Sequence, residues 1–386
     1  MNRIYQTMFL TFFSIISISM PLWAQDYYLF VGTYTKPGDN GIYVLRFNTE
    51  TGKLDSVSAV GNIDNPSYLA IALDAKYLYA VNETGGSKSG EASSFSFNHS
   101  TGKLTFMNKR STGGDNPCYI SVHPSGNWVT AGNYSGGNFA VFPIDKNGNL
   151  LEASQIVEHS GNSINKQRQD KPHVHATRFS NDQKYLYVPD LGTDKIHVYP
   201  FDAKKDLPVD IAAASYIETS AGSGPRHVTE HHKLPVLYVI EELSGKVSAY
   251  RKNGTKWTFV QTIDAHPSDY NEARGSADIH LSPDGKFLYA SNRGKSNSIA
   301  IFAVDQLSGK LELKGFQSTM GLTPRNFVID PSGKYLLAAN QQSGSIVVFR
   351  RNSESGLLEE TAEKFVVSSP VCLKFLDASL QPVSPR

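Results

Sequence analysis

Histidines, acidic residues and arginines recur at two kinds of position in this sequence. The first kind follows a proline or small residue at the start of a short apolar run, and it holds His173, His175, Arg226, His227, Asp278, His280 and Arg325. The second kind ends a neighbouring run rich in Tyr and Leu, and it holds Glu83, Asn133, Asp190, Glu241, Glu242, Arg293 and Gln341. Histidine transfers protons near neutral pH, and guanidinium groups stabilise developing negative charge. Together these residue types indicate acid–base chemistry on an anionic or anion-forming substrate, if the fold brings them together.

The same residues have alternative interpretations. Strand-end acids and amides often only cap turns, and this explanation is favoured for Glu83, Asn133 and Asp190. His227 and His280 are equally compatible with packing inside a sheet. The pair His173 and His175 could hold zinc, because alternate strand residues point the same way, but this signal is weak.

Motifs for other chemistries are absent from the sequence. There is no Gly-x-Ser-x-Gly nucleophile turn, no His-Glu-x-x-His metal site and no acidic calcium loop. We therefore expect neither a bound metal nor a cofactor.

An internal repeat indicates which elements must position these residues. Each unit contains a short apolar strand, a turn with Pro, Asp or Ser and Gly, a strand rich in Tyr and Leu, a polar loop and a third strand. Successive units start 48 to 56 residues apart, by subtraction of their first positions: Asn65, Asn116, Pro172, Pro225, Ser276 and Pro324. Units of this length, built from four short strands without helical periodicity, predict a β-propeller.

The two ends of the chain predict how the propeller closes. A seventh unit starts at Tyr27 without an opening strand, and the segment from Ser369 to Phe375 resembles the missing innermost strand. We expect an all-β, seven-bladed β-propeller whose first blade is closed by both chain ends. Closure removes the sheet edges that could pair with other chains.

This topology predicts where the polar residues meet. The first two strands of a blade are antiparallel, so the start of one lies beside the end of the other, on one face of the disc. The residues at those positions should surround one mouth of the central funnel. His123, His231 and His232 belong to the turns on the opposite face, and His99 belongs to an outer hairpin.

Composition excludes several classes of protein. The 386 residues hold 37 Lys and Arg against 36 Asp and Glu, so no basic surface for nucleic acid or an anionic membrane is indicated. Cys118 and Cys372 each lie in a strand-like run, and we interpret them as buried small hydrophobic residues, although a disulfide between them is permitted. We expect a monomer acting on a small molecule.

The N-terminus predicts export. Arg3 precedes a 13-residue apolar stretch from Met8 to Met20, and Ala24 offers a cleavage site. Residues 1–24 are thus predicted to be a signal peptide, and residues 25–386 a single propeller domain in the periplasm or outside the cell. An uncleaved anchor is the alternative; no later segment is apolar enough to cross a membrane.

Several segments, in order, resemble the 6-phosphogluconolactonase-like lactonase family of seven-bladed propellers over essentially the whole mature chain. They are Arg168-Gln-Asp-Lys-Pro-His-Val-His, Pro189-Asp-Leu-Gly-Thr-Asp-Lys-Ile, Gly224-Pro-Arg-His, Glu242-Leu-Ser-Gly-Lys-Val, Ala277-Asp-Ile-His-Leu-Ser-Pro-Asp-Gly, Ser291-Asn-Arg-Gly and Pro324-Arg-Asn-Phe. The family also includes fungal enzymes that cyclise carboxy-muconate to a lactone. One departure is that family members of the pentose phosphate route work in the cytoplasm, whereas this chain is predicted to be exported.

The resemblance implies a catalytic set of His175, Glu242, Arg226 and Arg293, and Arg325 matches a further arginine of the family. His173, Asp278 and His280, which stand at strand starts, are expected with Arg325 to be substrate contacts. His175 would be the general base, Glu242 would orient it, and an arginine would bind the oxyanion. The expected activity is hydrolysis of a sugar lactone to the aldonic acid, with 6-phospho-glucono-1,5-lactone as a candidate substrate. A lactonising cycloisomerase and a non-enzymatic binding propeller are the alternatives.

Overall fold

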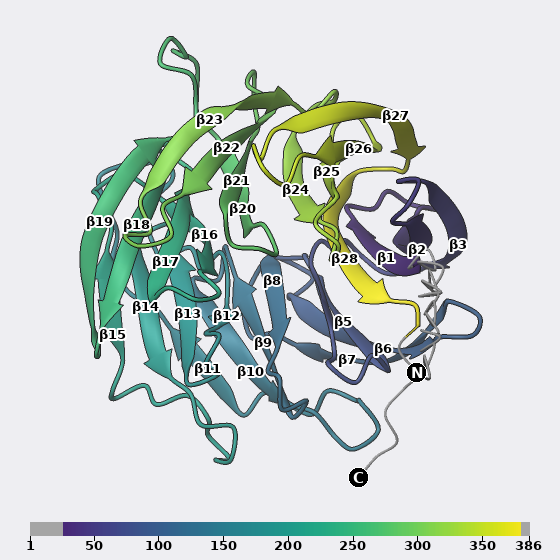
Figure 1. Ribbon diagram of the computed structural model, residues 1–386. Helices are drawn as coiled ribbons and strands as arrows, with labels where there is room; N and C mark the ends of the chain where they lie inside the picture. Colours follow the sequence, from purple (N-terminus) through teal and green to yellow (C-terminus); the bar gives the residue numbers. More distant parts are fainter. Residues whose placement is uncertain (1–25, 380–386) are drawn as a thin grey trace, which may run out of the picture.

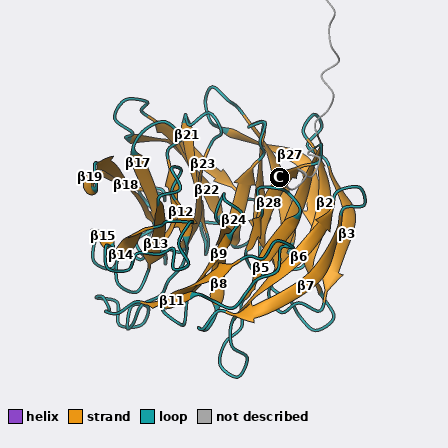
Figure 2. Cartoon of the chain, turned by 90° about the horizontal axis from the view of Figure 1, so that it is seen from below, coloured by secondary structure: helices purple, strands orange, loops and turns teal. Residues whose placement is uncertain are grey.

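Residues 26–379 are described by a computed structural model of the chain. They contain strands and loops but no α-helix (Figure 2). None of these residues therefore belongs to a helix long and apolar enough to span a membrane. The predicted signal peptide, residues 1–24, lies outside the described residues.

The strands form seven four-stranded antiparallel sheets that follow one another around a ring (Figure 1). The first three sheets are built from β1 (Asp26–Thr33), β2 (Asn40–Asn48), β3 (Leu54–Gly61) and β28 (Pro370–Asp377); β4 (Leu69–Ile71), β5 (Tyr77–Asn82), β6 (Glu91–Asn98) and β7 (Lys103–Ser111); and β8 (Pro117–Val122), β9 (Trp128–Asn133), β10 (Asn138–Pro143) and β11 (Gln155–Glu158). The fourth and fifth are built from β12 (Arg178–Phe179), β13 (Tyr185–Asp190), β14 (Lys195–Pro200) and β15 (Ser215–Glu218); and β16 (Pro225–Glu230), β17 (Val236–Glu241), β18 (Lys246–Asn253) and β19 (Lys256–Asp264). The last two are built from β20 (Ser276–Leu281), β21 (Phe287–Asn292), β22 (Ser298–Val304) and β23 (Leu311–Ser318); and β24 (Pro324–Ile329), β25 (Tyr335–Asn340), β26 (Ser345–Arg351) and β27 (Leu358–Val366).

The ring closes through the two ends of the chain. Strand β28, drawn in yellow, lies beside β1, drawn in purple, and pairs with it from Tyr27 opposite Asp377 to Gly32 opposite Cys372 (Figure 1). The first blade thus has the order β28-β1-β2-β3. The predicted seven-bladed architecture and its closure by both termini are confirmed.

Tyrosines of the second strands connect neighbouring blades, which explains why tyrosine and a hairpin glycine recur in the repeat. The Tyr238 hydroxyl donates a hydrogen bond to the carbonyl of Gly309, 2.8 Å away, in the hairpin of the next blade. Gly309 has a φ of 70°, and a Cβ there would lie 2.8 Å from Val236, so the turn requires glycine. Tyr335 makes the equivalent bond to the Glu50 carbonyl at 3.1 Å and so joins the last blade to the first. Other bonds of this kind are Tyr79 to Gly148 and Tyr289 to Gly356.

Bulges interrupt the innermost strands where the candidate site residues stand. Pairing of β8, β16 and β24 with their neighbours skips one residue near the start of each strand: Cys118, Arg226 and Arg325, respectively. A bulge bends its strand and re-aims the extra side chain. The bulged positions therefore set the directions in which Cys118 and the two arginines project.

The fourth blade differs from the expected pattern. A strand was predicted from Pro172, but β12 is only Arg178–Phe179, and Val174 forms an isolated bridge with Asp190. The backbone at Gly192 lies very close to the backbone at Lys171. A Cβ at residue 192 would lie 1.9 Å from the carbonyl oxygen of Lys171, so this approach requires glycine. His173 and His175 therefore stand on a tightly held irregular segment.

Candidate active site

A cavity of about 380 Å³ opens among strand starts and strand ends from several blades. Its size is within the usual range for small-molecule sites. The lining residues are Tyr34, Glu83, Cys118, Tyr134, Arg168, His175, Glu242, Arg274, Gly275, Arg293 and Arg325. Four of the predicted site residues are in this set: His175, Glu242, Arg293 and Arg325.

Glu242 is the centre of the charged network. Its Oε2 accepts hydrogen bonds from Nε of Arg226 and lies 3.0 Å from Nη2 of Arg293, while its Oε1 accepts one from Nη2 of Arg168 at 2.7 Å. Burial would raise the pKa of Glu242, but Arg293, Arg226, His175 and Arg168 outweigh it and hold that pKa well below its usual range. Glu242 is therefore a carboxylate that holds three arginines in place.

His175 lies beside this carboxylate and is buried. Its Nε2 is 3.8 Å from Oε2 of Glu242, and its Nδ1 is 3.5 Å from the sulfur of Cys118. Burial, followed by the positive charge of Arg226, lowers the pKa of His175 well below the usual value, against the opposing effect of Glu242. The imidazole is thus neutral at pH 7, which is the state a general base requires.

Arg226 lies behind Glu242 and does not line the cavity. Only 2% of its surface is exposed, and its Nη1 donates to the carbonyl of Ala277 while Nε donates to Glu242. Burial, with the nearby Arg325 and Arg293, lowers its pKa to about 10, which keeps it charged at pH 7. Arg226 was one of two arginines expected to bind the oxyanion, and in the structure its Nε and Nη1 already donate to protein oxygens.

Two of the four arginines that line the cavity, Arg293 and Arg325, differ in how they are held. Nε of Arg293 donates to the carbonyl of Gly275 at 2.9 Å, and its Nη2 pairs with Glu242. The guanidinium of Arg325 lies 5.5 Å from the centre of the Tyr34 ring and makes no hydrogen bond or ion pair with any residue in the described range 26–379. Its guanidinium donors are therefore available to a substrate.

Glu83 forms the opposite wall. Both of its carboxylate oxygens accept hydrogen bonds from the Tyr34 hydroxyl, at 2.9 and 2.8 Å, and the Ser67 hydroxyl donates to Oε2. Burial raises the pKa of Tyr34, and Arg325 opposes this shift. The favoured interpretation of Glu83 as a turn cap is therefore incomplete, because it also positions a tyrosine in the cavity.

Asp278 and His280, predicted as substrate contacts, do not line the cavity. Asp278 is 1% exposed and accepts hydrogen bonds from His227 at 2.7 Å, from His280 at 2.9 Å and from the amide of Asn326. Burial opposes ionisation, yet His280 and His227 hold the pKa of Asp278 well below its usual range. These residues form a separate buried network along the inner strands.

His173, the remaining predicted contact, also lies outside the lining. It stacks on the Tyr134 ring with centroids 4.4 Å apart, and its Nδ1 donates to the Tyr134 carbonyl at 2.9 Å. The irregular segment that carries His175 into the cavity turns the side chain of His173 against Tyr134. His173 supports the wall rather than facing substrate.

Sequence reasoning missed six lining residues: Tyr34, Cys118, Tyr134, Arg168, Arg274 and Gly275. Arg168 and Arg274 come from loops that precede the inner strands, where the repeat carries no signal. Both cysteines are free and buried, as interpreted, but Cys118 faces His175 instead of being a purely structural residue. The bulge in β8, which the sequence does not reveal, accounts for this placement.

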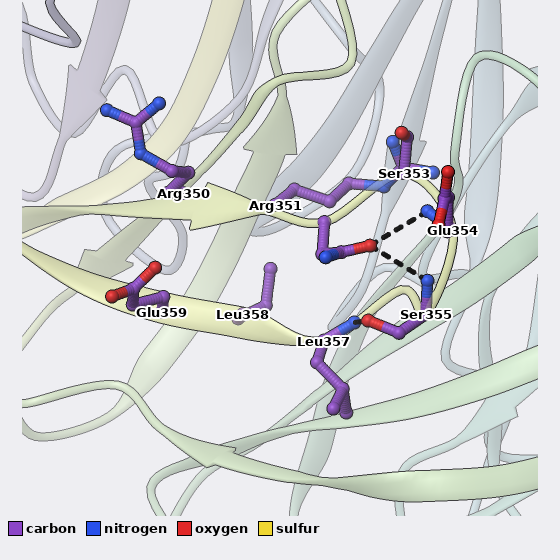
Figure 3. A pocket seen from close by; sticks show the side chains of 9 residues that line it. Arg350, Arg351, Ser353, Glu354, Ser355, Leu357, Leu358 and Glu359 are labelled. Atoms are coloured by element: carbon purple, nitrogen blue, oxygen red, sulfur yellow. Dashed lines mark hydrogen bonds between the residues drawn. The ribbon is translucent and has the colours of Figure 1, made fainter.

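A larger hollow, of about 640 Å³, lies far from these groups beside the hairpin between β26 and β27 (Figure 3). Its polar atoms are engaged locally, since the side-chain oxygen of Asn352 accepts hydrogen bonds from the backbone amides of Glu354 and Ser355, both at 2.9 Å. It holds no histidine and no converging charges of the kind found around Glu242. We therefore take the cavity at the funnel mouth as the candidate active site.

The chain belongs to a family whose described fold, a seven-bladed propeller, is the one found here. Residues 28–375 match the model of the family described as lactonase, 7-bladed beta-propeller. The match covers nearly all of the described chain.

Named relatives share most of their length with this chain. It is 39% identical to a 6-phosphogluconolactonase of Formosa agariphila, with 91% of this chain and 100% of the relative covered, and 35% identical to a 6-phosphogluconolactonase of Bacillus subtilis, with 90% and 97% covered. Among solved structures it is similar to a periplasmic gluconolactonase of Pseudomonas aeruginosa, at 35% identity and a TM-score of 0.85, with 91% and 99% covered.

Proposed function

We propose that this chain is a lactonase that hydrolyses a sugar lactone to the aldonic acid. The observation that carries the proposal is a neutral, buried histidine in a cavity where four arginines line the wall against two glutamates. Ester hydrolysis needs a base for water and a cation for the oxyanion, and this cavity supplies both. The names of the relatives from Formosa and Bacillus, and of the Pseudomonas structure, support the same activity.

In the proposed reaction, Nε2 of His175 takes a proton from water, and the resulting hydroxide attacks the lactone carbonyl carbon. Arg325, whose donors are free, binds the oxyanion of the tetrahedral intermediate. Glu242 stabilises the imidazolium that forms beside it. When the ring carbon–oxygen bond breaks, the imidazolium returns its proton to the departing alkoxide, which becomes a hydroxyl group of the aldonic acid.

Roles for the other predicted residues follow from their contacts. Arg293 lines the cavity and binds a substrate oxygen, whereas Arg226 fixes Glu242 from behind and is a positioning residue. Arg168 stands at the exposed rim, with 43% of its side chain accessible, and is placed to meet a charged group at the distal end of a substrate. Such a group would be the phosphate of 6-phospho-glucono-1,5-lactone.

The activity is tested by following acid release from sugar lactones, with and without a 6-phosphate, by the purified mature chain. We expect hydrolysis of at least one lactone far above the uncatalysed rate. An Arg168→Ala variant should raise KM for a phosphorylated lactone more than for its unphosphorylated counterpart. Equal effects would remove the phosphate assignment, and no catalysis of any lactone would overturn the proposal.

We also propose that the chain works after export. Its N-terminal sequence has the pattern of a signal peptide, and the Pseudomonas relative is named as periplasmic. N-terminal sequencing of the protein from a periplasmic or secreted fraction should begin near Gln25 or Asp26. An intact Met1 in a soluble cytoplasmic protein would contradict export.

A further inference from the structure

A second cluster of histidines and a carboxylate lies outside the active site. His159, in the loop after β11, Asp190, at the end of β13, and His197, in β14, each offer a ligand atom within 4.8 Å of the other two. The side chains of His159 and Asp190 are 1% and 0% exposed, and the two imidazole rings have centroids 4.0 Å apart. Two imidazoles and one carboxylate form a ligand set that Zn²⁺ commonly uses.

We propose that His159, Asp190 and His197 bind one divalent transition-metal ion of the Zn²⁺ type. One nitrogen in the cluster points to a missing ligand: Nε2 of His197 is buried and has no hydrogen-bond partner among residues 26–379. A buried ring nitrogen without a partner is costly in a folded protein, and a metal ion would use its lone pair. In a tetrahedral zinc site the ligand atoms are about 3.3 Å apart. The ligand atoms of this cluster lie within 4.8 Å of one another, and Nδ1 of His159 lies 2.8 Å from Oδ2 of Asp190, so only small shifts in both directions are needed.

The groups around the cluster already orient two of its members. Nδ1 of His159 donates to Oδ2 of Asp190 at 2.8 Å, and the Tyr199 hydroxyl donates to Nε2 of His159 at 3.0 Å. On metal binding, the imidazole of His159 changes tautomer, so that its proton lies on Nε2 and not on Nδ1. Nε2–H then donates a hydrogen bond to the Tyr199 oxygen. Nδ1 of His159 and Oδ2 of Asp190 then both bind the ion, while Tyr199 holds the ring in place. No proton is lost in this exchange, and a fourth position remains for water.

The cluster also lies at both ends of the loop that carries Arg168. His159 begins this loop, and His173 ends it. Oδ1 of Asp190 accepts a hydrogen bond from the backbone amide of His173, 2.8 Å away. A metal ion at Asp190 would therefore fix the whole segment from His159 to His173. The ion would be structural, and its link to the active site would be the placement of Arg168 at the cavity rim.

Metal binding is tested on the mature chain without a histidine tag, after dialysis against EDTA. Calorimetric titration with ZnCl₂ should show about one equivalent bound per chain, and the melting temperature should rise. His197→Ala and His197→Gln should each weaken binding at least tenfold, whereas His232→Ala, at an exposed histidine far from the cluster, should leave it unchanged.

A spectroscopic readout keeps the test independent of variant folding and of lactonase activity. Co²⁺ added to the EDTA-treated wild-type chain should give the visible bands of a four-coordinate nitrogen and oxygen site. Absence of binding and of these bands would overturn the proposal. Binding that His197→Ala leaves intact would do the same, because it would place the ion elsewhere.

Discussion

Nδ1 of His175 lies 3.5 Å from the sulfur of Cys118. The thiol also lies 3.6 Å from the His175 carbonyl oxygen and 3.8 Å from that of Val174, to either of which it can donate its proton. When the thiol donates its proton there, the sulfur can accept a hydrogen bond from Nδ1–H of His175. Nε2 of His175 is then the basic nitrogen, and it lies beside Glu242. The pair therefore selects the tautomer in which His175 can act as a base.

His175→Ala should lower kcat by roughly 10² to 10⁴, because it removes the general base, while substrate binding changes little. Steady-state kinetics on the best lactone found for the wild type measure this effect. His232→Ala is the matched control and should keep wild-type turnover. Unchanged kcat in His175→Ala would show that the base assignment is wrong.

Cys118→Ala should keep catalysis within about tenfold of wild type, since the thiol positions His175 and does not attack the substrate. Burial raises the pKa of Cys118 well above its ordinary value, so little thiolate is present at neutral pH. Mass spectrometry during turnover should detect no acyl-enzyme. A loss comparable with that of His175→Ala, together with a trapped thioester in the wild type, would instead identify a nucleophile.

The acid limb of the kcat/KM profile should lie below pH 6.5, the ordinary pKa of histidine. Burial and Arg226 lower the pKa of His175, so the imidazole stays neutral, and active, as the pH falls through 6.5. Arg325 lowers the same pKa, so Arg325→Gln should move the limb to higher pH. A limb that stays in place in this variant would exclude His175 as the titrating group.

Arg325→Ala should lower kcat at least tenfold with little loss of stability, because its guanidinium has no protein hydrogen-bond partner in the described chain. Lysine at this position should restore only part of the activity, since a point charge lacks the planar fork of donors. The readout is kcat and KM beside a melting curve. This role would be contradicted if Arg325→Ala had a lower melting temperature while the folded protein kept its specific activity.

Arg226→Ala, unlike Arg325→Ala, should lose stability as well as activity. Removing Arg226 takes one of three arginine partners from the buried Glu242 and leaves the buried carbonyl of Ala277 without its donor. We therefore expect about 3 kcal/mol less stability, and activity lost through misplacement of Glu242. Urea unfolding followed by fluorescence measures the first effect. An unchanged unfolding midpoint would contradict the buried structural role.

The sequence alone was sufficient to predict the propeller, because each blade repeats the same local chemistry. The Tyr-rich second strands and the hairpin glycines recur, and the missing strand at Tyr27 matches the extra strand at Cys372. Antiparallel adjacency then placed His175, Glu242, Arg293 and Arg325 at one mouth. These predictions depend on strand order and strand direction, which a repeat encodes directly.

Only the tertiary structure decided which of those residues face the cavity. Bulges at Cys118, Arg226 and Arg325 re-aim single side chains without leaving a pattern in the sequence, and Arg168 reaches the cavity from a loop outside the repeat. The cluster of His159, Asp190 and His197 combines three separate segments and has no motif spacing. The residues that form a blade recur along the chain and can be recognised in the sequence, whereas the direction of one side chain depends on contacts between distant segments.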